Sequence, residues 1–164
     1  IGGNHFIHGC RRNIDLTVVC MNNQIYGMTG GQGSPTTPLG CLSSTTPYGC
    51  AETPFDLCDL AIAAGANYVS RWTSYHVKEL EKAVLAGLQT PGFSFIEALV
   101  QCPTAFGRRN KFKQVADHVE YLRSHSMLKA KHDRLLEQGE PVPTDMFIVG
   151  ELMRRNRPAL GVKP

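Results

Sequence analysis

Continuous apolar runs, separated by amphipathic segments, mark the chain as far as about residue 100. Three runs rich in β-branched and aromatic residues predict buried strands at residues 16–21, 67–72 and 93–100. Apolar residues at helical spacing predict helices at residues 1–13, 55–65 and 75–88. Strands that alternate with helices form βαβ crossovers, because parallel strands need a long connection. The pattern therefore predicts an α/β fold class built on a parallel sheet.

Finer features of the pattern place side chains within these elements. Ser74 can cap the helix at residues 75–88, and Gly65 suits the end of the preceding helix. The apolar face of the later helix, expected to point inward, consists of Val77, Leu80, Ala83, Val84 and Leu88. Three parallel strands are few for a sheet covered on both faces, so we expect further strands outside this chain.

The pattern changes after about residue 108. A charged amphipathic segment predicts one long helix at residues 115–136, and the sequence Gly-Glu-Pro-Val-Pro at residues 139–143 ends it. A short strand at residues 146–149 and a polar tail at residues 154–164 follow. We therefore expect a main domain at residues 1–101 and a helical C-terminal extension at residues 102–164.

Composition narrows the classes of function. The chain has 164 residues, 42% of them hydrophobic, and a formal net charge of +3, as is usual for a globular domain. No apolar run is long enough to cross a bilayer and no signal peptide begins the sequence, so we expect a cytoplasmic protein with no membrane partner. In the basic clusters at residues 108–113 and 154–157, no aromatic residues are interleaved in a way that would form base-stacking platforms, so we expect no nucleic acid partner. The first residue is not methionine, which indicates a fragment.

The stretch richest in candidate chemistry follows the first predicted strand. That strand ends at Asn22-Asn23, and a glycine-dense loop continues to Gly40. Ligands of open α/β sheets bind beyond the carboxyl ends of the strands, and oxygens such as the Asn23 amide and the Ile25 carbonyl suit Mg²⁺. Glycines let backbone N–H groups approach a phosphate. From the residues alone, a diphosphate-binding loop and a long turn without a ligand are equally open.

The cysteines form no recognisable metal motif. There are six, at positions 10, 20, 41, 50, 58 and 102, and none belongs to a C-x-x-C pair. Residue types alone therefore indicate reduced, mostly buried thiols, with Cys102 at the end of a strand.

Three separated motifs resemble one enzyme family. They are IGGNHFIHGCRRNID at the start, NNQIYGMTGGQGSPTTPLG after the first strand, and CPTAFGRRNK from Cys102 to Lys111. In this order they resemble the β subunit of 2-oxoacid:ferredoxin oxidoreductases, most closely the 2-oxoglutarate type. The resemblance extends from Ile1 to about Lys113. It implies an N-terminally truncated fragment in which residues 1–101 are the C-terminal part of a thiamine-diphosphate-binding domain of α/β fold.

The resemblance also assigns site residues. It implies that Asn23 and the carbonyl of Ile25 bind the Mg²⁺ that holds the diphosphate of thiamine diphosphate. The residues that would line the cofactor are Asn23, Ile25, Tyr26, Gly27, Met28, Thr29 and Gly30. Cys102 matches one ligand of a [4Fe–4S] cluster, and its other ligands lie outside this chain. The Gly-Asp-Gly triplet of the family, which supplies a carboxylate ligand, is absent before Asn22.

The reaction implied by the resemblance is the oxidative decarboxylation of a 2-oxoacid to an acyl-CoA and CO₂. Electrons pass through the cluster to ferredoxin, and the cofactor supplies the difficult chemistry. The implied partners are the α subunit of the same enzyme, ferredoxin, the 2-oxoacid and coenzyme A. We assign no catalytic acid or base to this chain, and we expect the fragment alone to be inactive.

Two alternatives remain open. A non-oxidative thiamine-diphosphate decarboxylase or synthase of 2-oxoacids would share the loop but would not need Cys102. A non-catalytic interaction module would keep the loop as structure and would dock an acidic partner on the basic segment from Arg108 to Lys113.

Overall fold

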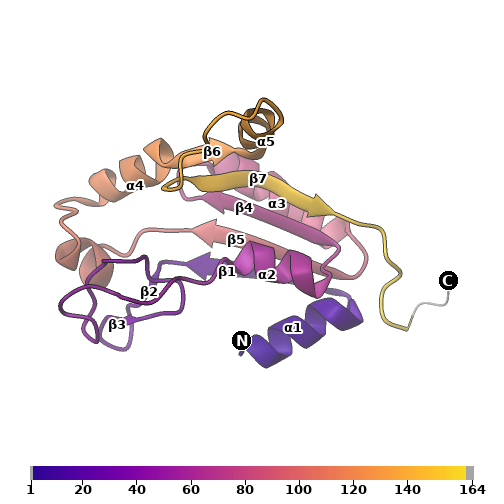
Figure 1. Ribbon diagram of the computed structural model, residues 1–164. Coiled ribbons are helices and arrows are strands. Elements are labelled where there is room, and N and C mark those ends of the chain that lie inside the picture. The colour runs from indigo at the N-terminus through magenta and orange to yellow at the C-terminus, as the bar shows by residue number, and fades with distance from the viewer. Residues whose placement is uncertain (1, 162–164) are drawn as a thin grey trace.

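The computed structural model describes residues 2–161 (Figure 1). The helices are α1 (Gly3–Arg12), α2 (Leu57–Ala64), α3 (Val77–Gln89), a π-helical turn η1 (Pro103–Gly107), α4 (Val115–Ser124) and α5 (Lys129–Glu137). The strands are β1 (Leu16–Asn22), β2 (Ile25–Tyr26), β3 (Gln32–Gly33), β4 (Tyr68–Thr73), β5 (Phe93–Leu99), β6 (Ser126–Leu128) and β7 (Phe147–Arg154). The three predicted helices and three predicted strands of the first part of the chain are confirmed within a few residues.

One mixed sheet organises the chain, with the strand order β1-β5-β4-β7-β6. Strands β1, β5 and β4 are parallel, as predicted. β7 runs antiparallel to β4, and β6 runs parallel to β7. The α/β fold class is confirmed, and the parallel part of the sheet carries an antiparallel addition. Because β6 and β7 come from beyond residue 101, the sheet crosses the expected domain boundary, and the division at residues 101 and 102 stays a prediction.

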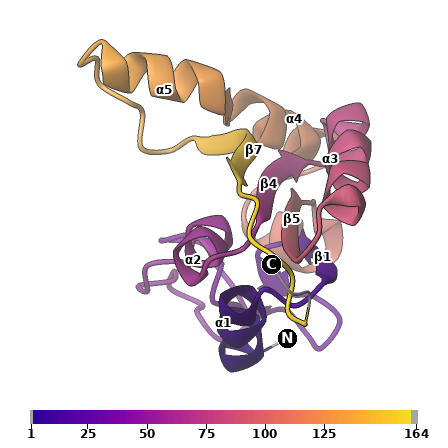
Figure 2. The ribbon, with the colours of Figure 1, turned by 90° about the vertical axis from the view of Figure 1, so that its right-hand side faces the viewer.

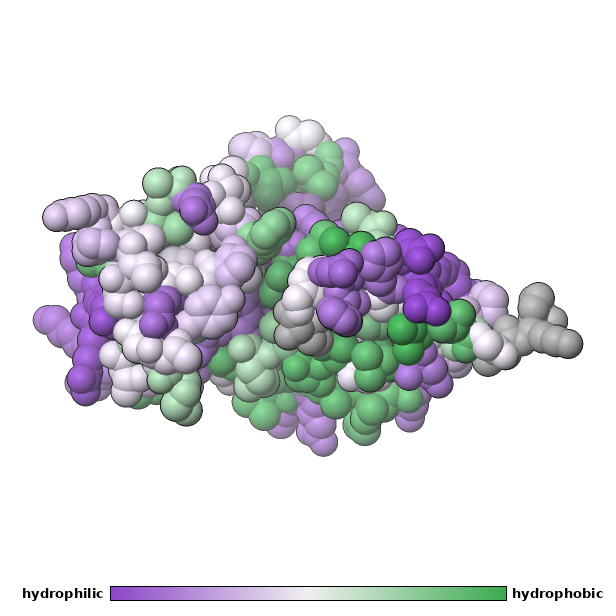
Figure 3. All heavy atoms as spheres, turned by 90° about the horizontal axis from the view of Figure 1, so that it is seen from below, coloured by the Kyte–Doolittle hydropathy of each residue, from purple (hydrophilic) through white to green (hydrophobic). Residues whose placement is uncertain are grey.

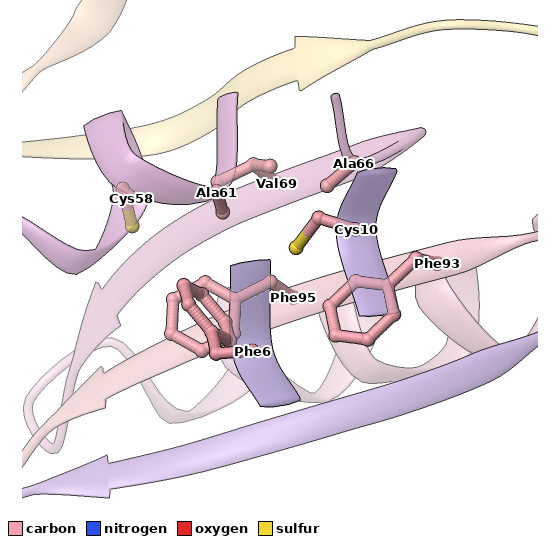
Figure 4. Packing of buried hydrophobic residues seen from close by; sticks show 8 residues of the cluster. All are labelled: Phe6, Cys10, Cys58, Ala61, Ala66, Val69, Phe93 and Phe95. Carbon is pink, nitrogen blue, oxygen red and sulfur yellow. The ribbon is translucent and has the colours of Figure 1, made fainter. Parts of the chain in front are cut away.

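Helices cover both faces of the parallel strands. Figure 2 shows α1 and α2 on one side of β5 and α3 on the other. Successive side chains of a strand point to opposite faces, so Phe93 and Phe95 pack under α1 and α2 while Ile96 packs under α3. Figure 4 shows the first of these clusters, in which Phe6 of α1 lies edge-on to Phe95 with ring centroids 4.9 Å apart. β5 is therefore the middle one of the three parallel strands, and every residue of it is buried.

β1 is less buried than the sequence predicts. Its side chains Val19 and Met21 are 42% and 63% exposed. In the described residues β1 lies at one edge of the sheet, paired with β5 alone. Figure 3, seen from the side of α1 and β1, shows hydrophobic side chains gathered on the half of this face that these elements occupy. An apolar edge strand of this kind is open to pairing with another strand.

The start of α3 differs from the prediction. The residue preceding the helix is His76 rather than Ser74, whose hydroxyl instead donates to Gln101 Oε1 at 2.7 Å. Val77 and Leu88, expected to point inward, are 65% and 66% exposed. The buried face of α3 is therefore narrower than predicted. Gly87 lies directly over the sheet, where a Cβ would be 2.7 Å from Ile96 Cδ1.

The single long helix predicted at residues 115–136 is wrong. The chain forms α4, then the short strand β6, then α5. The break follows from non-local hydrogen bonding, because β6 pairs with β7 and the N–H of Phe147 donates to the carbonyl of His125 at 2.7 Å. β7 is longer than the strand predicted at residues 146–149, so Arg154 belongs to the sheet rather than to a tail. Residues 162–164 of the predicted tail lie outside the described part.

No helix within residues 2–161 is both long enough and apolar enough to cross a bilayer.

A buried histidine joins the C-terminal helices to η1. The ring of His118 stacks on Phe112 with centroids 4.3 Å apart and on Phe106 with centroids 5.4 Å apart. Neither ring nitrogen has a hydrogen-bond partner in the described structure. Burial lowers the pKa of His118 below its ordinary value of 6.5. The folded protein therefore holds this imidazole neutral inside an aromatic stack.

We predict that this histidine makes the fold acid-sensitive. The unfolded chain takes up a proton near pH 6.5 whereas folded His118 does so only at lower pH, so stability is lost as pH falls below about 6.5. His118→Phe removes this uptake. Between pH 7 and 5, the unfolding free energy of the wild type should fall more steeply, by up to about 1.4 kcal/mol per pH unit. Denaturant titration of both proteins over this range measures the difference, and equal slopes would contradict it.

Candidate functional site

The predicted cofactor loop leaves the carboxyl end of β1. After Asn22 the chain forms the small hairpin of β2 and β3, and an irregular segment then continues to Asp56, the residue that caps α2. Gln24 adopts a left-handed conformation with φ 61°, which is uncommon outside glycine. This turn at the strand end directs the hairpin away from the sheet.

Asn23 and Ile25, the two predicted metal ligands, lie at the base of the hairpin. The Asn23 Oδ1 accepts the N–H of Ile25 at 3.3 Å, a long bond that closes a local turn. An amide oxygen has two lone pairs, so it retains acceptor capacity for a cation. The side chain of Ile25 is buried and fixes the position of the backbone that carries the second predicted ligand, its carbonyl.

The tip of the hairpin is exposed and contains consecutive glycines. Met28 is fully exposed and Tyr26 is about half exposed. Gly30 and Gly31 have φ angles of 124° and 84°, so side chains are disfavoured there. The hydroxyl of Thr29, one of the residues expected to line the cofactor, donates to Gln32 Oε1 at 2.6 Å. The loop therefore presents backbone and a methionine side chain on an accessible surface.

Cys102 meets this loop although the two are far apart in the sequence. It follows β5 and precedes η1, and a Cβ placed on Gly27 would lie 3.0 Å from its sulfur. Ile25 and Cys102 belong to the same buried cluster, with Phe106. The structure thus brings both predicted sites to one edge of the sheet.

The surroundings of Cys102 favour a thiolate. Burial alone would raise the pKa of the thiol, but the backbone N–H groups of Phe106 and Ala105 and the Thr104 hydroxyl interact with the sulfur, and the net pKa lies below its ordinary value of 9.0. By contrast, burial raises the pKa of Cys10 to about 11 and raises the pKa of Cys20. A thiolate is the form that binds a metal.

The described residues do not complete a metal site. Within residues 2–161 no group of three or more His, Cys, Asp or Glu side chains could hold a metal ion. The amide of Asn23 and the carbonyl of Ile25 fit a hard cation such as Mg²⁺, and the thiolate of Cys102 fits an iron–sulfur cluster. Each set is partial, and both would need ligands from other parts of the protein.

A buried polar network lies beside the loop, and sequence reasoning missed it. Glu97 of β5 accepts from Arg71 of β4 and from Asn22 of β1, and Arg71 also pairs with Asp56. These residues line part of a cavity of about 530 Å³ at the carboxyl end of the sheet. The available signal was a charged residue inside each of two continuous apolar runs, because a charge there needs a buried partner.

The remaining candidate residues, which are the basic segment from Arg108 to Lys113 and the two histidines of α1, lie at the surface. Arg109 donates to the carbonyl of Ala105 at 3.0 Å. Arg108, Lys111 and Lys113 are exposed, and no basic side chain from Arg108 to Lys113 forms an ion pair within the described part of the chain. His5 and His8 are exposed on α1, and within residues 2–161 no third His, Cys, Asp or Glu side chain joins them in a possible metal site.

The sequence of this chain is similar to those of known proteins. Residues 1–98 match the family described as "Thiamine pyrophosphate enzyme, C-terminal TPP binding domain". The 2-oxoglutarate synthase subunit KorB of Methanocaldococcus jannaschii is 51% identical over 160 residues, which cover 96% of this chain and 57% of that protein. The subunit of the same name from Archaeoglobus fulgidus is 60% identical over 104 residues, or 63% of this chain and 39% of that protein.

A solved structure has the same fold. The 2-oxoglutarate:ferredoxin oxidoreductase from Magnetococcus marinus, with 2-oxoglutarate, coenzyme A and succinyl-CoA bound, matches with a TM-score of 0.79 at 28% identity. The match covers 97% of this chain and 54% of that chain. The present chain therefore spans about half the length of the proteins that it resembles.

We predict that the thiol of Cys102 is more acidic than the thiols of Cys10 and Cys20. In protein treated with a chelator, the labelling rate of Cys102 by iodoacetamide should reach half its maximum below pH 9.0, and that of Cys20 above it. Peptide mass spectrometry after timed labelling measures both. Thr104→Val removes the hydroxyl 3.9 Å from the sulfur and should move the Cys102 midpoint upward. A Cys102 midpoint equal to that of Cys20 would contradict this prediction.

Proposed function

The chain belongs to the thiamine pyrophosphate enzyme family through its C-terminal TPP-binding domain, and on that premise we propose that it is part of the beta subunit of a 2-oxoglutarate:ferredoxin oxidoreductase. Thiamine pyrophosphate is another name for thiamine diphosphate. The strongest structural support is the contact between the two candidate sites, since Gly27 of the loop packs against the sulfur of Cys102. The similarity of nearly the whole chain to 2-oxoglutarate synthase subunits supports the choice of substrate.

The loop is the part that would hold thiamine diphosphate with Mg²⁺. Asn23 offers one amide oxygen and Ile25 one carbonyl, and these are hard ligands of the type that Mg²⁺ prefers. The glycines after Met28 keep the hairpin free of side chains where a diphosphate would approach. Tyr26, Gly27 and Thr29 complete the proposed lining. A carboxylate ligand would come from another part of the protein.

Cys102 would be one ligand of a [4Fe–4S] cluster. Its lowered pKa favours the thiolate form that such clusters bind. The N–H groups of η1 that lower this pKa would also donate toward a cluster-bound sulfur, and hydrogen bonds to sulfur raise the cluster potential. The contact with Gly27 would place the electron acceptor next to the loop.

When bound, thiamine diphosphate supplies the carbon–carbon bond cleavage, and the cluster accepts the electrons. This chain's own residues bind and orient the cofactor and exclude water at the base of the loop, where Ile25 and Phe106 are buried. The proposed products are succinyl-CoA and CO₂. The proposed partners are an α subunit, ferredoxin and coenzyme A, and the proposed location is the cytoplasm.

We predict that Asn23 controls cofactor affinity. In the full-length subunit assembled with its partner, Asn23→Ala removes one oxygen ligand and should weaken binding of thiamine diphosphate with Mg²⁺ by about ten- to a hundredfold. Asn23→Asp restores an oxygen ligand and should recover binding. Calorimetric titration measures both affinities. Wild-type protein that gives no binding signal would overturn the proposed cofactor, and an unaffected Asn23→Ala would overturn the assigned ligand.

We predict separately that Cys102 controls iron content. In the same assembled enzyme, Cys102→Ala should lower bound iron and abolish ferredoxin reduction while leaving thiamine diphosphate affinity unchanged. Cys41→Ala is the matched control, because Cys41 packs against the same cluster of apolar residues and is not a proposed ligand. If iron and ferredoxin reduction survive Cys102→Ala, the assignment of Cys102 as a cluster ligand is overturned. A wild-type enzyme that decarboxylates the 2-oxoacid without reducing ferredoxin would instead support a non-oxidative decarboxylase or synthase.

A further inference from the structure

We propose that Asn22 and Glu97 are positioning residues that close the base of the cofactor loop and thereby hold Asn23 and Ile25 in place for the metal. This role rests on the proposed function of the loop. It concerns residues that neither the motifs nor the comparisons assign. A continuous set of hydrogen bonds runs from the buried strand β5 to both arms of the loop.

The inner end of this set is rigid. Glu97 is 2% exposed in the middle of β5, and its Oε2 accepts from Arg71 Nε at 2.6 Å. Arg71 lies directly opposite Glu97 in the sheet register. It also donates to Asp56 Oδ1 at 2.7 Å, and the same carboxylate caps α2 by accepting from the N–H of Asp59. Two strands and a helix therefore fix the carboxylate of Glu97.

The other oxygen of Glu97 sets the orientation of Asn22. Glu97 Oε1 accepts from Asn22 Nδ2 at 2.7 Å. Because a carboxylate accepts hydrogen bonds, the nitrogen of the amide must face Glu97 and its oxygen must face away. The direction in which Asn22 presents its acceptor is thus determined by the buried network.

The oxygen of Asn22 then binds both arms of the loop. It accepts the N–H of Gln24 at 2.9 Å, on the outgoing arm, and the hydroxyl of Thr36 at 2.8 Å, on the returning arm. A parallel connection runs from the Thr37 hydroxyl to the carbonyl of Gln24 at 2.6 Å. Asn23, Ile25 and the whole hairpin lie between these two anchored arms.

This arrangement suits preorganisation rather than general stability. Met28 at the tip of the hairpin is fully exposed, and Gly30 and Gly31 beside it carry no side chain, so the tip adds little packing that could hold Asn23 and Ile25 at the base. Ligands held by an anchored base lose less conformational entropy on binding. Loosening one arm should therefore reduce cofactor affinity while the sheet keeps its stability.

Thr36→Val is the decisive variant, because it removes only the hydroxyl on the returning arm and leaves the buried charges paired. In the assembled enzyme we expect roughly two- to tenfold weaker binding of thiamine diphosphate with Mg²⁺. We also expect a raised cofactor concentration for half-maximal rate, an unchanged rate at saturation and an unchanged melting temperature. Amide hydrogen exchange of residues 23–33 in cofactor-free protein should become faster.

Two further variants complete the test. Asn22→Ala should produce the same changes to a greater extent, and Thr36→Val alone decides the matter if Asn22→Ala does not fold. Ser74→Ala is the matched control, since its hydroxyl makes a 2.7 Å bond to Gln101 at the same edge of the sheet but outside the loop.

The outcomes separate this inference from the proposed function. If Thr36→Val and Ser74→Ala have the same rate of hydrogen exchange in the loop and the same cofactor affinity, the positioning role is overturned. Faster loop exchange in Thr36→Val, with wild-type protein that binds no cofactor, supports the anchoring of the loop and overturns the proposed cofactor instead.

Discussion

A buried carboxylate in β5, the middle one of the three parallel strands, is the constraint on which the carboxyl edge of this sheet depends. Glu97 lies in β5 with apolar residues on both sides along the chain. Removing a carboxylate from water is costly unless charged and hydrogen-bonding partners surround it. Arg71 and Asn22 are those partners, and they come from the two strands that flank β5. The need to satisfy one charge thus aligns the ends of β1, β4 and β5.

The geometry of the candidate site follows from this alignment of strand ends. The loop leaves β1 one residue after Asn22, and Cys102 follows β5 by three residues beyond Leu99. Parallel strands place both departures at the same edge, as is typical of open α/β sheets. The narrow space between Gly27 and the sulfur of Cys102 follows, and a larger residue than glycine would not fit there without movement. The proposed cofactor loop and cluster ligand are therefore coupled by packing.

Local patterns predicted those parts of the fold that are specified locally. Continuous apolar runs identified β1, β4 and β5, and Gly65 does end α2 in a left-handed conformation with φ 96°. The prediction of one long helix was wrong because residues 126–128 form a strand by pairing with β7. A local sequence pattern does not reveal such non-local pairing. Burial of β1 was overestimated for a similar reason, since an apolar run does not reveal whether a strand is central or at an edge. The loop motif predicted Asn23 and Ile25 as candidate ligands, but it contained no sign of the Glu97 network that lies beside them.

The pair Asn22-Asn23 shows why such support is hidden in a motif. Two identical residues in succession suggest a shared role, yet successive side chains at the end of a strand point to opposite sides. Asn22 is buried, its amide nitrogen donates to Glu97, and its amide oxygen accepts from Gln24 and Thr36. Asn23 is half-buried, and its oxygen accepts one long bond from the N–H of Ile25, so this oxygen retains acceptor capacity. The same side chain therefore serves as an internal anchor at one position and as a candidate ligand at the next, and the strand geometry decides which is which.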